Sequence, residues 1–211
     1  LSCDTFFYRV GLSFWTKYGS DPTDVKARDP LIAVAKDFGF GSDTGIDLPA
    51  EASGRIADRR WKQKYWEMLK PRYCKMAAEK NAPRDYLHVF AAEFCLEGNQ
   101  YRAGDAVNYS IGQGDTLVTP LQLARAYAAL SNGGSLYRPT IARAVAGTGG
   151  KVLKEIKPVV ERRIDSTGAA LKYVDQALIG TPRQGTLAWR FVGFPLDQIP
   201  IRGKTGSAEV W

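Results

Sequence analysis

A chain of 211 residues with 45% hydrophobic and 24% charged residues has the composition of an ordinary globular protein, and its length suits one domain or a large part of one. It has no run of eighteen or more apolar residues, which excludes a membrane-spanning helix within this sequence. The chain opens on Leu1 without a signal-like segment, so we expect a fragment or a processed piece.

The net charge of +7 is concentrated in one segment. Residues 59–84 carry nine Lys or Arg against Glu67 and Glu79, which leaves +7 in that segment alone. Interleaved aromatics make nucleic-acid binding one interpretation, and attraction to anionic lipid or polymer another. The interpretation that we favour is a solvated helical insertion whose long side chains cover apolar neighbours, at about residues 59–105.

Cysteine and histidine are too few and too irregularly spaced for a zinc site. Cys3, Cys74 and Cys95 lack metal-ligand spacing, and the one histidine, His88, cannot complete a Cys/His set. We therefore expect no metal and no cofactor. A disulfide between Cys74 and Cys95 is one alternative, and three buried thiols is the alternative that we prefer.

The first half of the chain has helical signals separated by loops. We expect a helix after the start, capped by Asp4 or Thr5, and a second one with Asp29 as N-cap, Pro30 at its first position and Gly39 as its stop. A loop over 42–51 precedes the basic segment. A further helix is predicted around 85–96, ended by Gly98 and Asn99.

Residues 110–134 give the best-defined helix prediction. Thr119 is a typical N-cap, Pro120 takes the first helical position, and Gln122 completes a capping box. An apolar stripe of Leu123, Tyr127 and Leu130 and a small-residue stripe of Ala124 and Ala128 are expected to pack. Gly133 and Gly134 end the helix.

The last third predicts a hairpin, a helix and a final strand. Residues 135–147 and 150–160 alternate like strands around Gly149 and Gly150, a helix follows over 166–182, and 199–211 is typical of an extended strand. Helices mixed with late strands favour an α+β fold with an antiparallel sheet.

The segment Lys204-Thr205-Gly206-Ser207 suits the edge of such a strand. Gly206 has no side chain, so another backbone can approach it closely. Thr205 and Ser207 offer hydroxyls to a carboxylate, and Lys204 adds positive charge. An extended peptide could dock there as an added strand.

Three segments together carry a family resemblance. "GFGSDTGIDLPAE", "VNYSIGQGDTLVTPLQLARAYAALSNGG" and "IRGKTGSAEV" resemble the class B penicillin-binding proteins, the D,D-transpeptidases of peptidoglycan synthesis. Ser2-Cys3-Asp4 fits the family's Ser-x-Asn motif in a Ser-x-Asp form. With "DTFFY" after it, this form is more similar to the cell-elongation type, penicillin-binding protein 2, than to the cell-division type.

The resemblance implies a fold, an activity and partners. The fold would be the serine beta-lactamase-like transpeptidase fold, incomplete here, with residues 1–211 as a partial transpeptidase domain. The full-length protein would cross-link stem peptides that end in D-alanyl-D-alanine, and beta-lactams would acylate it. A glycosyltransferase and other membrane proteins of cell-wall synthesis would be its partners, and nucleic acid would not. It would sit in the cytoplasmic membrane with its catalytic domain on the extracytoplasmic side, anchored outside this chain.

The resemblance also implies a role for each motif residue. Ser2 would belong to the proton relay, and Asp4 would take the amide-recognition place that Asn usually fills. Lys204 would give electrostatic support, and Thr205 would bind the C-terminal carboxylate of the stem peptide. The Ser207 N–H would form half of the oxyanion hole. It would lie on a strand where Gly206, which has no side chain, leaves room for the backbone of a bound peptide.

The nucleophile is absent from this sequence. No Ser-x-x-Lys occurs in the chain, and in the family this motif precedes the Ser-x-Asn loop, which would put it before Leu1. We therefore expect the chain alone not to acylate. Two alternatives stay open, namely a beta-lactam sensor or serine beta-lactamase relative, and a non-catalytic basic binding module.

Overall fold

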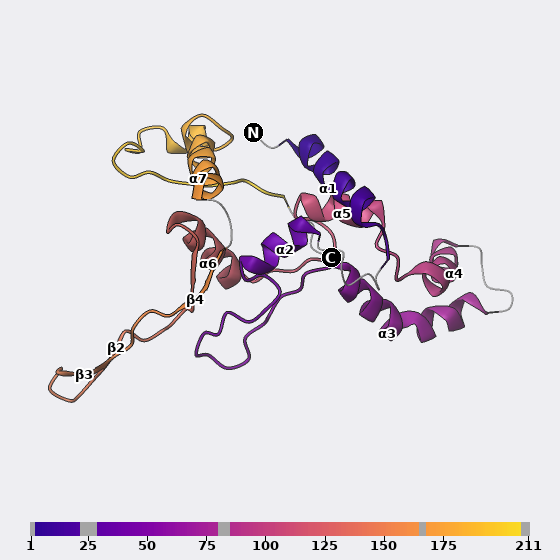
Figure 1. Ribbon diagram of the computed structural model, residues 1–211, viewed down its shortest axis with the longest axis horizontal. Helices are drawn as coiled ribbons and strands as arrows, with labels where there is room; N and C mark the ends of the chain where they lie inside the picture. The colour runs from indigo at the N-terminus through magenta and orange to yellow at the C-terminus, as the bar shows by residue number, and fades with distance from the viewer. Residues whose placement is uncertain (1–2, 22–28, 80–84, 165–167, 208–211) are drawn as a thin grey trace. The chain divides into compact units, whose positions relative to one another are not determined.

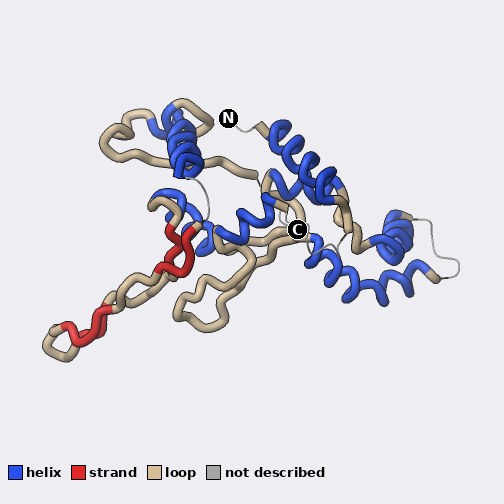
Figure 2. Tube along the Cα trace, in the orientation of Figure 1, coloured by secondary structure: helices blue, strands red, loops and turns tan. Residues whose placement is uncertain are grey.

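The computed structural model describes residues 3–21, 29–79, 85–164 and 168–207. It has the mixed composition of helix and antiparallel strand that the sequence predicts (Figures 1 and 2). The elements in chain order are α1 (Asp4–Tyr18), α2 (Pro30–Asp37), α3 (Arg59–Ala77), α4 (Tyr86–Glu97), α5 (Ala103–Ser110), α6 (Pro120–Ser131), β1 (Ser135–Tyr137), β2 (Ala144–Ala146), β3 (Val152–Glu155), β4 (Val160–Arg163), α7 (Gly168–Arg183) and a 3₁₀ turn, η1 (Ala188–Phe191).

The chain divides into two compact units that each contain several segments. The first, here called the ribbon unit, comprises residues 1–3, 34–55 and 117–211, and the second, the helical unit, comprises residues 4–33 and 56–116. Among the described residues, no helix is both long and apolar enough to span a bilayer.

The ribbon unit is named after one long antiparallel hairpin. β1 pairs with β4 at its base and β2 pairs with β3 toward its tip, each as a two-stranded ladder (red in Figure 2). The turn closes at Gly147–Gly150, where the Gly150 N–H donates to the Gly147 carbonyl at 2.9 Å and Gly150 has φ +77°. The predicted hairpin around Gly149 and Gly150 is therefore confirmed.

The core of the ribbon unit lies where the hairpin base meets α6. Ala129 of α6, Leu136 of β1 and Ile164 after β4 are buried together, and Phe38 packs against them. Leu136 is fully enclosed, whereas every residue of β3 is exposed. The hydrophobic burial that stabilises the hairpin is thus confined to its base.

The helical unit contains two helix pairs. α1 packs on α5, where Gly11 is needed because a Cβ at this position would meet the Ala106 carbonyl oxygen at 2.6 Å. α3 packs on α4 as a hairpin, and the two helices run side by side in Figure 1. The aromatic residues of the basic segment lie in this hairpin: Tyr65 and Tyr73 both contact the ring of Phe94. These two aromatic side chains therefore pack within the hairpin.

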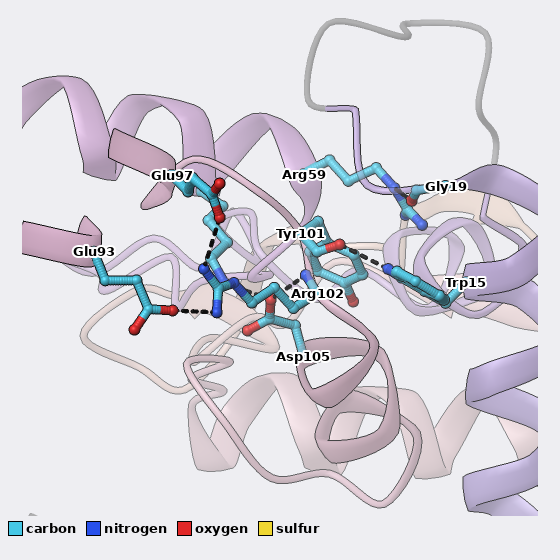
Figure 3. Close-up of polar contacts among 9 residues, drawn as sticks. Trp15, Gly19, Arg59, Glu93, Glu97, Tyr101, Arg102 and Asp105 are labelled. Carbon is cyan, nitrogen blue, oxygen red and sulfur yellow. Dashed lines mark hydrogen bonds and ion pairs between the residues drawn. The ribbon is translucent and has the colours of Figure 1, made fainter. Parts of the chain in front are cut away.

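Arg59, at the start of α3, is a buried charge of the helical unit. It is 6% exposed, and its guanidinium pairs with Asp29 at 3.2 Å and donates to the Gly19 carbonyl at 2.9 Å. It also lies over the ring of Tyr101, 4.4 Å from the centroid, as the stick view shows (Figure 3). Burial raises the pKa of the Tyr101 phenol, with a further rise from the charge of Asp29, so Tyr101 is neutral at physiological pH. One member of the predicted solvated basic run is therefore internal.

Two expectations about cysteines and helix starts need correction. Cys74 of α3 and Cys95 of α4 form a disulfide with a Cα–Cα distance of 4.9 Å, and Cys3 is free and exposed, so the preferred set of three buried thiols was wrong. α1 begins at Asp4, which places Asp4 and Thr5 inside its first turn rather than ahead of it. The acidic side chain of Asp4 still favours the positive end of the helix dipole.

Removing the disulfide should destabilise the α3–α4 hairpin. Its cysteines are 21 residues apart, and closing a loop of this size stabilises a protein by about 3 kcal/mol. We expect Cys95→Ser, or reduction of the wild type, to lower the unfolding midpoint and to speed hydrogen exchange in α3 and α4. Cys3→Ser is the matched control and should behave as wild type. Equal midpoints with and without reductant would contradict the prediction.

His88 and Asp85 at the start of α4 form a pH-sensitive contact. Asp85 caps the helix by accepting from the His88 N–H at 3.0 Å, and its Oδ1 lies 2.7 Å from the ring Nδ1. The Asp85 hydrogen bond raises the pKa of His88, and the His88 backbone bond, followed by its ring, lowers the pKa of Asp85. The His88 contribution to stability is thus full below a pH of about 6.5 and is lost as the pH rises through the folded pKa. The Asp85 contribution is present above a pH of about 3.9 and is lost as the pH falls.

The substitution Asp85→Asn separates the charge from the cap. Asn caps a helix as well as Asp, so α4 should be retained while the pKa of His88 falls toward its ordinary value of about 6.5. The measurement is an NMR pH titration of the His88 ring. Its signal is assigned as the one that disappears in the His88→Gln variant. Asp85→Ala should lose both the cap and the raised pKa. An unchanged His88 pKa in Asp85→Asn would show that the carboxylate charge is not its cause.

Candidate active site

The Lys204–Ser207 segment, which carries the Lys-Thr-Gly motif, lies in the ribbon unit and is attached to α7. The Gly203 N–H donates to the Leu178 carbonyl at 3.1 Å. Just before it, Arg202 forms an ion pair with both carboxylate oxygens of Asp175, and its Nη2 donates to Oδ2 at 3.0 Å. Both side chains are largely enclosed. The chain leading into the motif is therefore fixed to a helix by one charged and one backbone contact.

The predicted final strand is not present as a strand. Residues 200–207 have no regular secondary structure, and the part of 199–211 beyond Ser207 lies outside the described residues. A β-strand needs a hydrogen-bonded neighbour along its length, and no described segment forms a ladder with 200–207. The expected edge strand was therefore wrong for residues 199–207, which have no neighbouring strand among the described residues.

The side chains of the motif differ in exposure. Lys204 is exposed, and its Nζ donates to the Thr205 carbonyl at 2.6 Å. Thr205 is half-buried, whereas Gly206 and Ser207 are exposed. Asp4 is exposed at the start of α1 and belongs to the helical unit, whereas the Lys204–Ser207 segment belongs to the ribbon unit. Ser2 lies outside the described residues.

α6 is confirmed in every detail of its start. Thr119 accepts from the Gln122 N–H at 3.1 Å, the Gln122 side chain accepts from the Thr119 N–H at 2.9 Å, and Pro120 is the first residue. The helix places two polar side chains inward: Gln122 is 1% exposed and Arg125 is 6% exposed. Of the predicted stripes, Leu123, Ala124 and Ala128 are exposed, so their expected packing was wrong, whereas Tyr127 and Leu130 are half-buried. Beside the buried Ala126 and Ala129, the two polar side chains turn inward because they have loop carbonyls and a carboxylate to bind.

Gln122 holds the loop of residues 38–55, which follows α2. Its Nε2 donates to the carbonyls of Ser42 and Ser53, each at 2.7 Å. Within the loop, Glu51 accepts from the Thr44 hydroxyl at 2.5 Å and from the Thr44 N–H at 2.8 Å. Burial pulls the pKa of Glu51 upward, but these hydrogen bonds outweigh it and leave the pKa below its usual value. Two of the three segments that carry the resemblance therefore bind each other directly.

Arg125 holds the base of the hairpin. Its Nε donates to the Tyr137 carbonyl at 2.7 Å, and its Nη2 pairs with Glu161 at 2.6 Å. One side chain thereby contacts both strands of the β1–β4 ladder. Sequence reasoning missed this residue, and the signal that could have found it was its position three residues after Gln122 on the same face of α6.

The whole chain matches one protein family. The family model of the penicillin-binding protein transpeptidase domain matches residues 1–211. The chain belongs to the penicillin-binding protein transpeptidase domain family. Among curated relatives, the peptidoglycan D,D-transpeptidase MrdA of Acinetobacter baumannii is 29% identical over 212 aligned positions, which cover 100% of this chain and 24% of that protein. The chain thus spans about a quarter of that relative.

Solved structures show the same fold for this transpeptidase domain. Penicillin-binding protein 2B of Streptococcus pneumoniae R6 matches with a TM-score of 0.65 at 19% identity, over 99% of this chain and 29% of that one. A complex of penicillin-binding protein PBP2 and MreC from Helicobacter pylori matches with a TM-score of 0.53 at 20% identity, over 86% of this chain and 24% of that one. The predicted family and the predicted α+β transpeptidase fold are confirmed.

Breaking the Gln122 contacts should loosen the 42–55 loop of this transpeptidase domain. Gln122→Leu keeps the volume but leaves two carbonyls and the Thr119 N–H without partners, at a cost of about 3 kcal/mol. We expect a lower denaturation midpoint and faster hydrogen exchange at Thr44 and Gly45. Leu123→Ala, on the exposed side of the same helix, should change stability by less than about 1 kcal/mol. Equal effects of the two variants would refute this role for Gln122.

Proposed function

We propose that the full-length protein is a peptidoglycan D,D-transpeptidase of the cell-elongation type. The observation that carries the proposal is the family match over all 211 residues, with Lys-Thr-Gly at 204–206. The similarity to MrdA of Acinetobacter baumannii supports the elongation type. The substrates would be stem peptides that end in D-alanyl-D-alanine. Beta-lactams would acylate the same catalytic serine that attacks these peptides.

The reaction would proceed through an acyl-enzyme. A serine Oγ, supplied by a Ser-x-x-Lys motif outside residues 1–211, attacks the carbonyl of the penultimate D-alanine, and its proton passes through the relay to the leaving nitrogen. The amide C–N bond breaks and D-alanine leaves. The amine of a neighbouring stem peptide then attacks the ester, which forms the cross-link and returns a proton to the serine.

The motif residues of this chain would bind and orient the donor peptide. We assign Thr205 to the terminal carboxylate, Lys204 to electrostatic support and the Ser207 N–H to the developing oxyanion. Ser2 would belong to the proton relay and Asp4 would orient the donor amide, in place of the family's Asn. The fixing of Arg202 on Asp175 supports these roles, because it holds the chain just before Lys204 in one position.

The location and the partners belong to the same proposal. The disulfide between Cys74 and Cys95 supports an extracytoplasmic catalytic domain, because disulfides persist in oxidising compartments. A membrane anchor would lie outside this chain. The Helicobacter pylori PBP2 was solved with MreC, which supports a partner of that kind, and we add a glycosyltransferase to the proposed assembly.

Labelled penicillin tests the proposal directly. The full-length gene product, purified in detergent, should form a covalent adduct that survives denaturing electrophoresis and persists for many minutes. Excess unlabelled penicillin should block the adduct. A folded full-length protein without an adduct would overturn the proposal, and an adduct that hydrolyses within seconds would indicate a beta-lactamase.

In the same labelling experiment, Asp4→Asn tests the assignment of the motif residues. The exposed Asp4 can be replaced with little loss of stability because neutralising a carboxylate in the first turn of a helix costs only about 0.3–1 kcal/mol. We expect a changed acylation rate with a denaturation midpoint within a few degrees of that of wild type. Glu67→Gln, at an exposed position of α3, serves as the control and should acylate at the wild-type rate. An unchanged rate for Asp4→Asn would limit Asp4 to a structural role.

A further inference from the structure

The helical unit contains a pocket that none of the proposed catalytic residues line. It is a hollow of about 330 Å³ at the α3–α4 hairpin, near the lower end of the range for small-ligand sites, about 300–1,000 Å³. Four aromatic residues line it, two from each helix: Trp61, Tyr65, Phe90 and Phe94. The rings of Trp61 and Tyr65 are stacked, with centroids 4.9 Å apart and planes 19° from parallel. The pocket therefore offers flat aromatic surfaces.

Both cations that line the pocket, Lys62 and Arg102, are held in ion pairs, and the lining also carries the carboxylates of Glu93, Glu97 and Asp115. The Arg102 guanidinium binds Glu93 through one nitrogen and Glu97 through the other, as Figure 3 shows. Lys62 pairs with Asp105, which also accepts from the Arg102 N–H at 2.6 Å. Each cation of the lining thus already has a carboxylate partner.

This pairing argues against an anionic ligand. An anion would have to replace a carboxylate that already binds Arg102 or Lys62, and exchanging one solvent-accessible ion pair for another gains little, because such pairs contribute only about 0–1 kcal/mol. A neutral ligand can use the donors and acceptors that such pairs leave open, because each carboxylate oxygen has more than one lone pair and guanidinium has five N–H groups. The site therefore suits a ligand that has hydroxyl and amide groups and no negative charge.

The aromatic lining narrows the class further. The C–H groups on one face of a sugar ring carry slight positive charge and pack on the negative face of an aromatic ring. An acetamido methyl group adds apolar area for the rings of Phe90 and Phe94 to bury. A sugar ring with hydroxyls and an acetamide can pack on the aromatic rings and hydrogen-bond the paired charged groups at the same time.

We propose that this pocket binds an N-acetylated hexosamine, one short neutral segment of a glycan strand. This inference deepens the proposed function and rests on it, because a protein that cross-links stem peptides has such strands within reach. The protein would hold the glycan near the peptides that it cross-links. Trp61 and Tyr65 would provide the stacking surface, and Arg102 with Glu93 would hydrogen-bond the polar groups of the sugar.

The test uses N,N′-diacetylchitobiose with the full-length protein in detergent. We expect saturable binding with a Kd on the order of millimolar, measured by saturation-transfer NMR. Trp61→Leu should weaken binding roughly tenfold because it removes half of the aromatic stack. The control is Trp189→Leu, which removes an exposed tryptophan outside the pocket lining, and its affinity should equal that of wild type.

Two further arms keep the test decisive. Glu93→Gln changes a half-exposed side chain without altering its shape, and it should weaken binding even if Trp61→Leu fails to fold. The disaccharide of glucosamine lacks the acetyl groups and carries amines, so it should bind more weakly. Absence of saturable binding, wild-type affinity in both pocket variants, or tighter binding of the glucosamine disaccharide would each overturn the inference.

Penicillin labelling of the same preparation separates this inference from the proposed function. Wild type, Trp61→Leu and Glu93→Gln should all form the adduct equally, because the pocket residues take no part in acylation. A protein that is labelled by penicillin but does not bind the sugar would overturn the proposed sugar pocket and leave the transpeptidase proposal standing. Loss of labelling in the wild type would instead overturn the transpeptidase proposal.

Discussion

A buried guanidinium organises each of the two units. Arg125 connects α6 to both strands of the hairpin base, and Arg59 connects the start of α3 to Asp29 and Gly19. Taking a guanidinium out of water is costly unless carboxylates and carbonyls surround it. The segments that supply these partners are far apart in the chain, so the loops must close around the arginine for the charge to be tolerated. The positions of the loops follow from this requirement.

Local signals account for the elements that were predicted well. The start of α6 depends on residues within four positions of one another, and Thr119, Pro120 and Gln122 do what their types and spacing dictate. α2 is similar, because Asp29 caps it by accepting from the Leu31 N–H at 3.1 Å. The turn of the hairpin is also local, since glycine at Gly150 permits the positive φ.

The incorrect expectations concern contacts that a local pattern cannot contain. The inward face of α6 includes a polar side chain, Gln122, because it meets Ser42 and Ser53 from another part of the chain. The choice between a disulfide and free thiols depends on α3 and α4 lying side by side, which sequence spacing does not fix. Whether 200–207 forms a strand depends on a neighbour. Of the candidate site, the motif residues were identified by resemblance, and the supporting residues Arg202 and Asp175 were missed because their pairing is tertiary.

The long hairpin has a graded structure along its length. At its base Leu136 is fully enclosed and Arg125 binds both strands, whereas toward its tip Val145 and Leu153 are about half to two-thirds exposed. Backbone hydrogen bonds alone are a weak support for a two-stranded ribbon in water. The tip around Gly149 therefore contributes little to holding the rest of the unit together, and its side chains are under few packing constraints. The chain can accept length changes and foreign sequence there with the least disturbance, which makes this turn the natural place for an inserted tag or reporter.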